Sequence, residues 1–173
     1  RRAFPQRPDG LATKPVRLAV LGSSTLTHLL PAIRVAGLRR GIWVDTYEGD
    51  YGQYLQELSD PASDLHAFKP TAVLLALDAY HLTAGVTAGM DEAAANAALE
   101  EATTPIRETW KLARDAFKCP ILQQAALPVH LPVLGLNDHR LPGSRVGFIG
   151  RLHQTLRAVS AEDGVAVVSI DHR

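Results

Sequence analysis

Ser24 is the residue whose type and position best suit nucleophilic chemistry. It follows an apolar run over residues 16–21 that ends at Gly22, and it precedes a run with helical spacing. A serine at such a turn would lie at the edge of a sheet, in the positive field of a helix N-terminus that favours a developing oxyanion. In the alternative interpretation, Ser23, Ser24 or Thr25 simply caps the helix, because a hydroxyl satisfies free backbone N–H groups.

Other residues that could take part in chemistry follow the later predicted strands. Asp78 comes directly after an apolar run, and Asn137 and His139 lie in a long loop after the next one. We take His139 as a candidate general base and Asn137 as a substrate-binding group, since loops carry function disproportionately. The alternative for His139 is a solvated loop histidine. Gly52 is either a backbone donor to an oxyanion or a loop glycine with positive φ.

Apolar segments alternate with segments of helical spacing along the chain. Strands are predicted over residues 16–21, 42–44, 71–77, 120–124 and 165–170. Helices are predicted over residues 26–38, 51–58, 91–117 with an interruption near Pro105, and 145–161.

Strands that are apolar on both faces and alternate with helices indicate a parallel sheet that is covered on both sides. With right-handed crossovers, the pattern predicts an α/β fold: a three-layer, doubly wound, five-stranded parallel sheet of flavodoxin-like order, 2-1-3-4-5. In such a sheet the site lies beyond the carboxyl ends of the strands, which is where the residues considered above fall.

Composition and motifs exclude several classes of protein. Eighteen basic side chains balance 18 acidic ones, so we expect neither nucleic acid nor a membrane as a partner. A lone Cys119 can form no internal disulfide and no cysteine-based zinc site, which suits a cytoplasmic protein. The first turn lacks the glycines of a dinucleotide site and the lysine of a P-loop. We expect no cofactor and no metal in these residues.

The ends of the sequence suggest its domain organisation. Residues 1–15 contain three prolines and a glycine, and we expect them to be a flexible leader. Residues 16–173 are expected to be one domain. The sequence starts without methionine and stops three residues after the last predicted strand, so we expect a fragment that ends before a further domain.

Several blocks of the sequence together resemble a known family. The turn at residues 20–27 is similar to the first block of SGNH (GDSL-type) hydrolases, with Ser24 at the nucleophile and Ser23 in place of the usual aspartate. Over nearly the whole chain, the ordered blocks resemble the amino-terminal SGNH-like domain of FkbH-type proteins, in subfamily IIIC of the HAD superfamily. These blocks lie at residues 48–58, 63–70, 73–78, 121–124, 132–135 and 152–156.

The resemblance implies that a HAD-type phosphatase-like domain follows. Family members of the polyketide-associated kind take a glyceryl unit from a phosphorylated glycerate and load it onto an acyl carrier protein. The resemblance thus implies three partners, namely the acyl carrier protein, the HAD domain and an acyl or glyceryl group. The Asp-x-Asp-x-Thr motif that binds magnesium in HAD catalysis is absent from the 173 residues. We therefore expect Mg²⁺ only in a downstream domain.

The resemblance also indicates what the chain would need for catalysis. SGNH enzymes take a carboxylate and a histidine from an Asp-x-x-His stretch after the fifth strand, and this sequence stops at Asp171-His172-Arg173 before one appears. Asp78 falls at the family's oxyanion-hole asparagine, where an ionised carboxylate would repel the oxyanion. We expect the chain alone to be weakly active or inactive. The alternatives are a non-catalytic domain that docks the carrier or another partner, and a GDSL-type serine esterase that uses Ser24.

Overall fold

The computed structural model describes residues 7–170 and contains a five-stranded sheet in which all neighbouring strands are parallel. The strand order is β2-β1-β3-β4-β5, as the sequence predicted. The strands, in this spatial order, are Ile42–Glu48, Lys14–Gly22, Ala72–Ala76, Ile121–Gln124 and Ala166–Val168.

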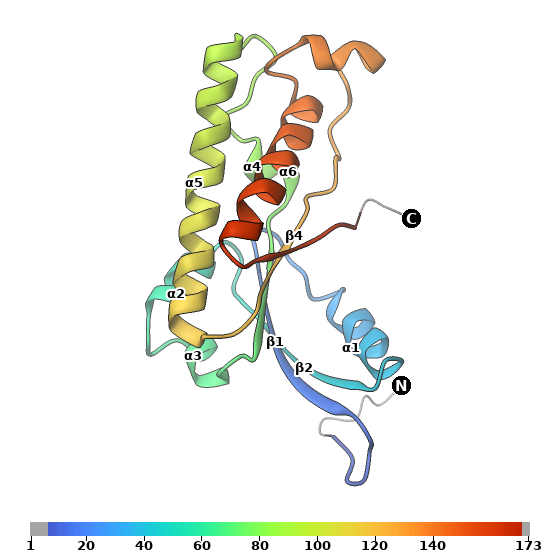
Figure 1. The fold of residues 1–173 in the computed structure, drawn as a ribbon. Coiled ribbons are helices and arrows are strands. Elements are labelled where there is room, and N and C mark those ends of the chain that lie inside the picture. The colour runs from blue at the N-terminus through green and yellow to red at the C-terminus, as the bar shows by residue number, and fades with distance from the viewer. Residues whose placement is uncertain (1–6, 171–173) are drawn as a thin grey trace.

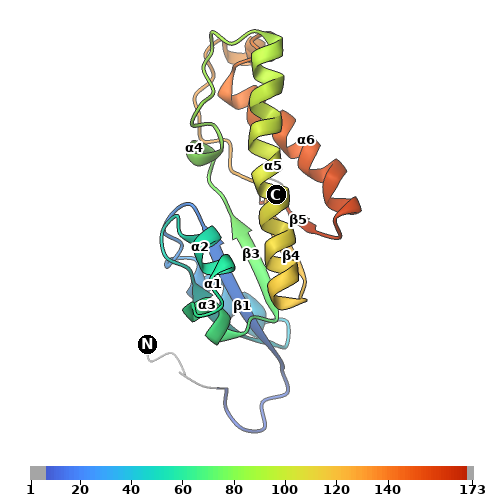
Figure 2. The same cartoon turned by 90° about the vertical axis from the view of Figure 1, so that its left-hand side faces the viewer.

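Helices cover both faces of the sheet, which confirms the α/β layers (Figure 1). On one face lie α2 (Tyr54–Ser59), α3 (Asp64–Phe68), α5 (Glu92–Phe117) and α6 (Arg145–Glu162), whereas α1 (Leu30–Leu38) covers the other face over β1 and β2. The upper half of α5 extends beyond the strands and packs beside α6 (Figure 2). None of the helices within residues 7–170 combines the length and the apolarity that crossing a membrane requires.

Successive side chains of β1 point alternately into the two cores on opposite faces of the sheet. Ala19 and Leu21 point into the larger core, together with side chains of α5 and α6 such as Trp110 and Phe148. Leu18 and Val20 point to the opposite face, toward α1. Because successive strand residues face opposite sides, a strand between two helical layers must be apolar throughout.

α1 begins later, and β1 begins earlier, than the sequence predicted. α1 begins at Leu30 rather than Leu26, with Pro31 in its first turn, where a proline loses no hydrogen bond. β1 begins at Lys14, inside the predicted leader, because Lys14 and Pro15 pair with the start of β2. Residues 1–6 of that leader, and Asp171-His172-Arg173 at the other end, lie outside the described residues.

Two further expectations about regular structure were wrong. α5 runs without interruption through Pro105, because its buried face, which includes Ile106 and Trp110, holds the helix against the core. The lost backbone hydrogen bond is at an exposed position. β5 is a short and partly exposed strand at the edge of the sheet, not a buried one over residues 165–170.

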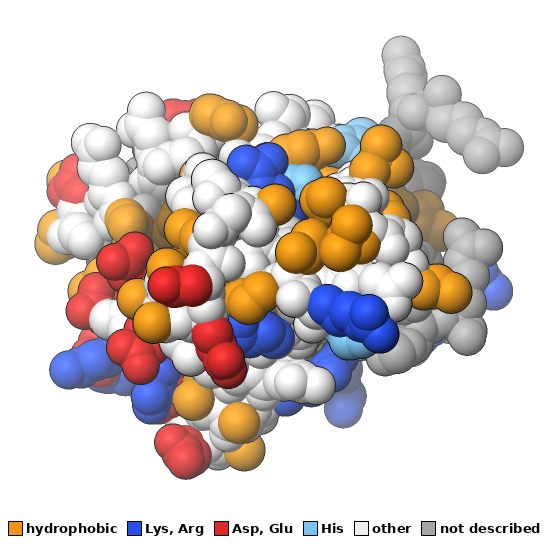
Figure 3. Space-filling model, turned by 90° about the horizontal axis from the view of Figure 1, so that it is seen from above, with side chains coloured by type: hydrophobic (Ala, Val, Ile, Leu, Met, Phe, Trp, Pro, Cys, Tyr) orange, Lys and Arg blue, Asp and Glu red, His pale blue; other side chains and the backbone are white. Residues whose placement is uncertain are grey.

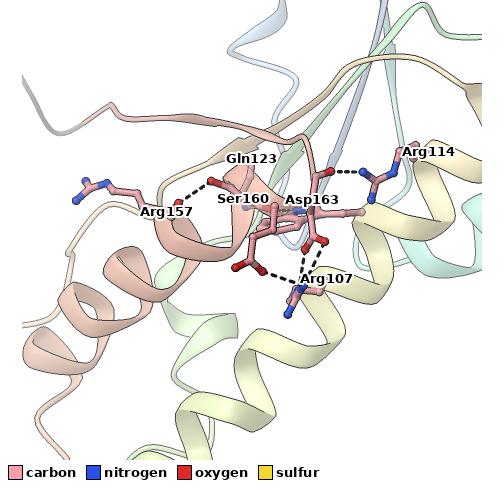
Figure 4. A network of polar contacts seen from close by, with 8 residues as sticks. Arg107, Arg114, Gln123, Arg157, Ser160 and Asp163 are labelled. Atoms are coloured by element: carbon pink, nitrogen blue, oxygen red, sulfur yellow. Dashed lines mark hydrogen bonds and ion pairs between the residues drawn. The ribbon is translucent and has the colours of Figure 1, made fainter.

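A network of charged groups ties α5 to the turn between α6 and β5 (Figure 4). Arg107 Nε donates to Asp163 Oδ2 at 2.7 Å, and Arg107 also faces Glu162 at 4.0 Å. Arg114, about two turns further along α5, donates to the backbone carbonyl of Asp163. The hydrogen bond from Arg107 is the main reason that the pKa of Asp163 lies below its ordinary value.

We expect Asp163→Asn to lower the melting temperature at pH 7 by no more than about 4 °C, since partly exposed ion pairs contribute little. A carboxyl whose pKa is depressed by folding stabilises the fold above its unfolded pKa, and this contribution disappears as the pH falls through its folded pKa. The difference between wild type and variant should therefore narrow once the pH falls below about 4, and disappear only below the lowered native pKa. Thermal melts at pH 7 and pH 3 measure it. The control is Asp115→Asn, whose carboxyl is 62% exposed; an equal loss there would contradict a specific role for Asp163.

Candidate functional site

A cavity of about 430 Å³ lies at the carboxyl ends of β1, β3 and β4. The loops that follow these strands converge there, at the place that a doubly wound sheet provides for a site. Its walls combine a few polar groups with apolar side chains, as is typical of small-molecule sites. The polar lining consists of Ser23, Ser24, Tyr51, Asp78, Tyr80 and Gln124, and the apolar lining of Leu77, Ala79, Leu127 and Val129.

Ser23 and Asp78 join the loops after β1 and β3. The Ser23 hydroxyl donates to Asp78 Oδ2 at 2.6 Å and accepts from the backbone N–H of Asp78 at 2.9 Å. The two strands approach closely at Gly22, where a Cβ would lie 2.8 Å from the backbone oxygen of Ala76. Ser23 is therefore a structural link and not an open hydroxyl.

Asp78 is the N-cap of the short helix α4 (Ala79–Leu82). Its Oδ1 accepts hydrogen bonds from the backbone N–H groups of Tyr80 at 2.9 Å and His81 at 3.0 Å. Partial burial raises the pKa of Asp78, but the hydrogen bonds from Ser23, His81 and Tyr80 outweigh burial, so that its pKa lies below the ordinary value. The group is thus an anion at neutral pH and offers no donor to an oxyanion.

Ser24 faces the cavity with a hydroxyl that no group in residues 7–170 engages in a hydrogen bond. The prediction that it begins a helix is wrong, and so is the capping alternative for Ser23, Ser24 and Thr25. The N-cap of α1 is Leu29, five residues further on. Ser24 therefore does not lie at the N-terminus of α1, and it is a half-buried, available hydroxyl at the carboxyl end of β1.

The two loop residues proposed as base and binding group lie elsewhere. Asn137 and His139 belong to the 3₁₀ helix η1 (Gly135–Arg140), which is drawn in orange at the top of Figure 1, beyond the end of the sheet. Both side chains are exposed, and His139 Nδ1 lies 3.1 Å from the backbone oxygen of Leu136. Neither residue lines the cavity, so the structure does not bring them to Ser24.

Gly52 lies in the loop after β2, with φ of +68° and open space around its Cα. This conformation favours glycine, in agreement with the loop-glycine alternative. Its neighbour Tyr51 is 72% exposed and contributes its side chain to the cavity. The loop thus supplies an aromatic hydroxyl that the sequence analysis did not single out.

His130 is a second residue that the sequence analysis missed. Its Nε2 lies 2.8 Å from Thr83 Oγ1 and 3.4 Å from the backbone oxygen of Ala79. Its ring packs edge-on against Tyr80, whose side chain lines the cavity, with 4.9 Å between the ring centroids. These partners lie about 50 residues away in the sequence, so no local signal could have identified them. His130 positions the cavity wall and does not itself line the cavity.

A second cavity, of about 290 Å³, lies between the end of β2 and α2 and has an acidic wall. Burial raises the pKa of Tyr47 to about 12, and the charges of Glu57, Asp64 and Asp50 add to this effect. Among the ion pairs of residues 7–170, none involves these carboxylates. The wall of this cavity therefore contains several carboxylates, whereas the cavity at Ser24 contains one, that of Asp78.

Metal binding finds little support in the described part of the chain. Within residues 7–170, no group of three or more His, Cys, Asp or Glu side chains is arranged to hold a metal ion.

Comparison with known structures shows the fold. The N-terminal part of the protein BF1531 from Bacteroides fragilis, containing a phosphatase domain complexed with Mg, matches with a TM-score of 0.74 at 16% identity, over 94% of this chain and 42% of that one. BT4096, a gut microbial diltiazem-metabolizing enzyme, matches with a TM-score of 0.61 at 13% identity, over 91% and 37%. TesA matches with a TM-score of 0.54 at 16% identity, over 87% and 76%. The chain thus spans less than half the length of the first two proteins.

A comparison of the sequence with models of protein families shows the family to which the chain belongs. No curated protein matches the chain. The family model described as "FkbH, N-terminal domain" matches residues 17–165, which is most of the chain, from β1 to the turn before β5. The chain therefore belongs to the family of FkbH amino-terminal domains.

Proposed function

We propose that the chain is the domain of an FkbH-type protein that binds the acyl or glyceryl group, and that it works with an acyl carrier protein and a HAD-type phosphatase-like domain. In this role the whole protein moves a glyceryl unit from a phosphorylated glycerate to the carrier. Membership of the FkbH family supports the proposal. The observation that carries it is the cavity at Ser24, which combines available hydroxyl groups with apolar walls.

The cavity suits a small neutral group with hydroxyls. Ser24, Tyr51 and Tyr80 can donate to or accept from a glyceryl hydroxyl, and the Gln124 side chain adds an amide. Asp78 is the one charged residue among those that line the cavity. Its negative charge disfavours a phosphoryl group. The dephosphorylated glyceryl group is therefore the better ligand, which leaves phosphate chemistry to another domain.

Binding is better supported than hydrolysis. A serine hydrolase needs a histidine in reach of the nucleophile and donors aimed at the oxyanion. No histidine lines the cavity formed by the described residues, and Asp78 presents an anion where the family's asparagine would donate. The available hydroxyl of Ser24 still favours a GDSL-type esterase as the second candidate, and one substitution separates the two.

We expect Ser24→Ala to weaken glyceryl transfer only modestly. Loss of one hydrogen-bonding hydroxyl costs about 0.5–1.5 kcal/mol, so KM for the glyceryl substrate should rise about 2–10-fold while kcat stays nearly constant. The assay measures loading of the carrier by intact-protein mass spectrometry, in a protein that joins this chain to its HAD-type domain. Thr25→Ala, an exposed neighbour outside the cavity, is the matched control.

The same variant tests the esterase alternative. If Ser24 were a nucleophile, its loss would lower kcat by about a thousandfold or more. Hydrolysis of an aryl acetate by the chain itself gives the second measurement. A thousandfold fall in either reaction would overturn the binding role, and unchanged kinetic constants for loading would remove Ser24 from the site altogether.

A further inference from the structure

Residues 127–136, which follow β4, form an exposed apolar surface. Leu131 is 89% exposed and Leu136 is 98% exposed. Exposing a large aliphatic side chain forgoes about 1.5–3 kcal/mol of burial, and contiguous patches of this kind mark interaction sites. The other exposed members of the surface are Leu127, Val129, Val133 and Leu134.

This surface has little regular structure, yet it is anchored on both sides. His130 is held by Thr83, a residue that is 1% exposed. At the far end, Asp138 accepts from the backbone N–H of Leu134 at 2.5 Å and from the hydroxyl of Ser144, the N-cap of α6. Because these contacts fix the segment before any partner arrives, a partner that binds it loses less entropy of ordering.

The stretch of sequence that contains the surface is basic, in a chain whose net charge is zero. From residue 116 to residue 161 the sequence contains one carboxylate, Asp138, and that group is buried and hydrogen-bonded. Seen from above, hydrophobic side chains gather to the right of centre with basic side chains beside them, whereas acidic side chains lie to the left (Figure 3). The basic residues of this stretch are Arg140, Arg145, Arg151 and Arg157, together with Lys118, which pairs with Asp115 at 3.4 Å.

The surface is continuous with the cavity at Ser24. Leu127 and Val129 belong to both, and Gln124, three residues before Leu127, also lines the cavity. Tyr80, on the rim, is 63% exposed. A partner that binds residues 127–136 therefore lies beside the opening of the cavity, and a group attached to that partner can enter the cavity.

We propose that residues 127–136, together with Arg140, are the docking surface for an acidic protein domain that presents an apolar side chain framed by carboxylates. Charge complementarity selects this partner over a second copy of the chain, whose matching surface would be equally basic. The identification of the domain as the acyl carrier protein rests on the proposed function. Docking then delivers the carrier-bound acyl or glyceryl group to the Ser24 cavity.

The test is a titration of the chain with purified holo-acyl carrier protein, followed by calorimetry. In the double variant L131S/L136S, both changed side chains are almost fully exposed, so the fold should persist, and we expect Kd to rise at least about tenfold. Arg140→Glu should slow association and raise Kd at low salt, with a smaller effect at high salt. Unfolding temperatures of all variants confirm that they remain folded.

Matched controls come from α1, on the other side of the sheet. The double variant V35S/L38S removes two exposed apolar side chains, and Arg39→Glu reverses an exposed charge. Neither change should alter Kd by more than about twofold. A second control uses a carrier whose surface carboxylates are changed to amides. Its Kd for the wild-type chain should be raised to about the value that the normal carrier has for Arg140→Glu.

Three results would contradict the proposed docking surface. The first is that the carrier fails to bind the wild-type chain, and the second is that it binds wild type and L131S/L136S with equal affinity. The third result is a wild-type dimer in sedimentation that L131S/L136S converts to a monomer.

A different result would contradict the proposed function alone. If the surface variants weaken carrier binding but no glyceryl unit reaches the carrier in the loading assay, docking stands and the transfer role is wrong.

Discussion

Trp110→Ala should abolish most of the stability of the fold. The indole is fully buried between α5 and the sheet, and its Nε1 donates to Gln123 Oε1 at 2.9 Å. Removing a buried aromatic side chain costs about 3–5 kcal/mol, and a stranded acceptor adds about 1–3 kcal/mol. The sum is comparable with the ~5–15 kcal/mol that holds a typical domain together. Urea unfolding followed by circular dichroism measures the loss.

A graded pair of variants separates packing from hydrogen bonding at this position. Trp110→Phe retains most of the buried ring and loses the N–H, so we expect a loss of about 1–3 kcal/mol. Gln123 would then keep only the donor bonds of its Nε2, to the backbone oxygens of Leu75 and Gln124. Lys111→Ala, one position along α5 and exposed, should change stability by less than about 0.5 kcal/mol. Equal stability of Trp110→Ala and Lys111→Ala would refute the assignment of Trp110 to the core.

Asp78→Ala should destabilise the loops that form the Ser24 cavity. The change removes the N-cap of α4, which costs about 1 kcal/mol, and strands the buried hydroxyl of Ser23, which costs about 1–3 kcal/mol. We expect a total loss of about 2–4 kcal/mol at pH 7. Asp78→Asn keeps a good capping residue and should lose much less. Chemical unfolding of the three proteins gives the comparison.

The pH dependence of this loss provides an internal control. Folding lowers the pKa of Asp78, so its ionised form stabilises the native state above the unfolded value of about 3.9 and ceases to do so as the pH falls through the lower native value. The gap between wild type and Asp78→Ala should therefore narrow between pH 5 and acid pH. A gap that widens in acid would mean that Asp78 is protonated in the native state.

The regular pattern of the sequence was sufficient to predict the fold. Apolar strands such as residues 71–77, separated by segments of helical spacing, permit few topologies once crossovers must be right-handed. The predicted ends of the helices and strands were less accurate. Pro31 marked the true start of α1, a signal that the sequence carries, whereas the continuity of α5 through Pro105 depends on packing that no local rule contains.

The sequence also placed the candidate site at the carboxyl edge of the sheet, where the cavity at Ser24 lies, because that location follows from the order of the strands. It could not choose among the residues there. His139 and Asn137 had suitable side chains and a suitable loop, yet that loop leads away from the edge to η1. His130, which had no evident partner in the sequence, contacts Thr83 and Tyr80 instead.

The family and the α/β fold were thus determined by the sequence alone, since both depend on patterns that are continuous along the chain. Which hydroxyl is available was decided only by tertiary structure. Ser23 and Ser24 are neighbours of the same type, but one is bound to Asp78 from a loop 55 residues away and the other faces the cavity. The reason is geometric: neighbouring residues at the end of a strand point in different directions, and the contact that occupies one of them forms only when β1 and β3 pair.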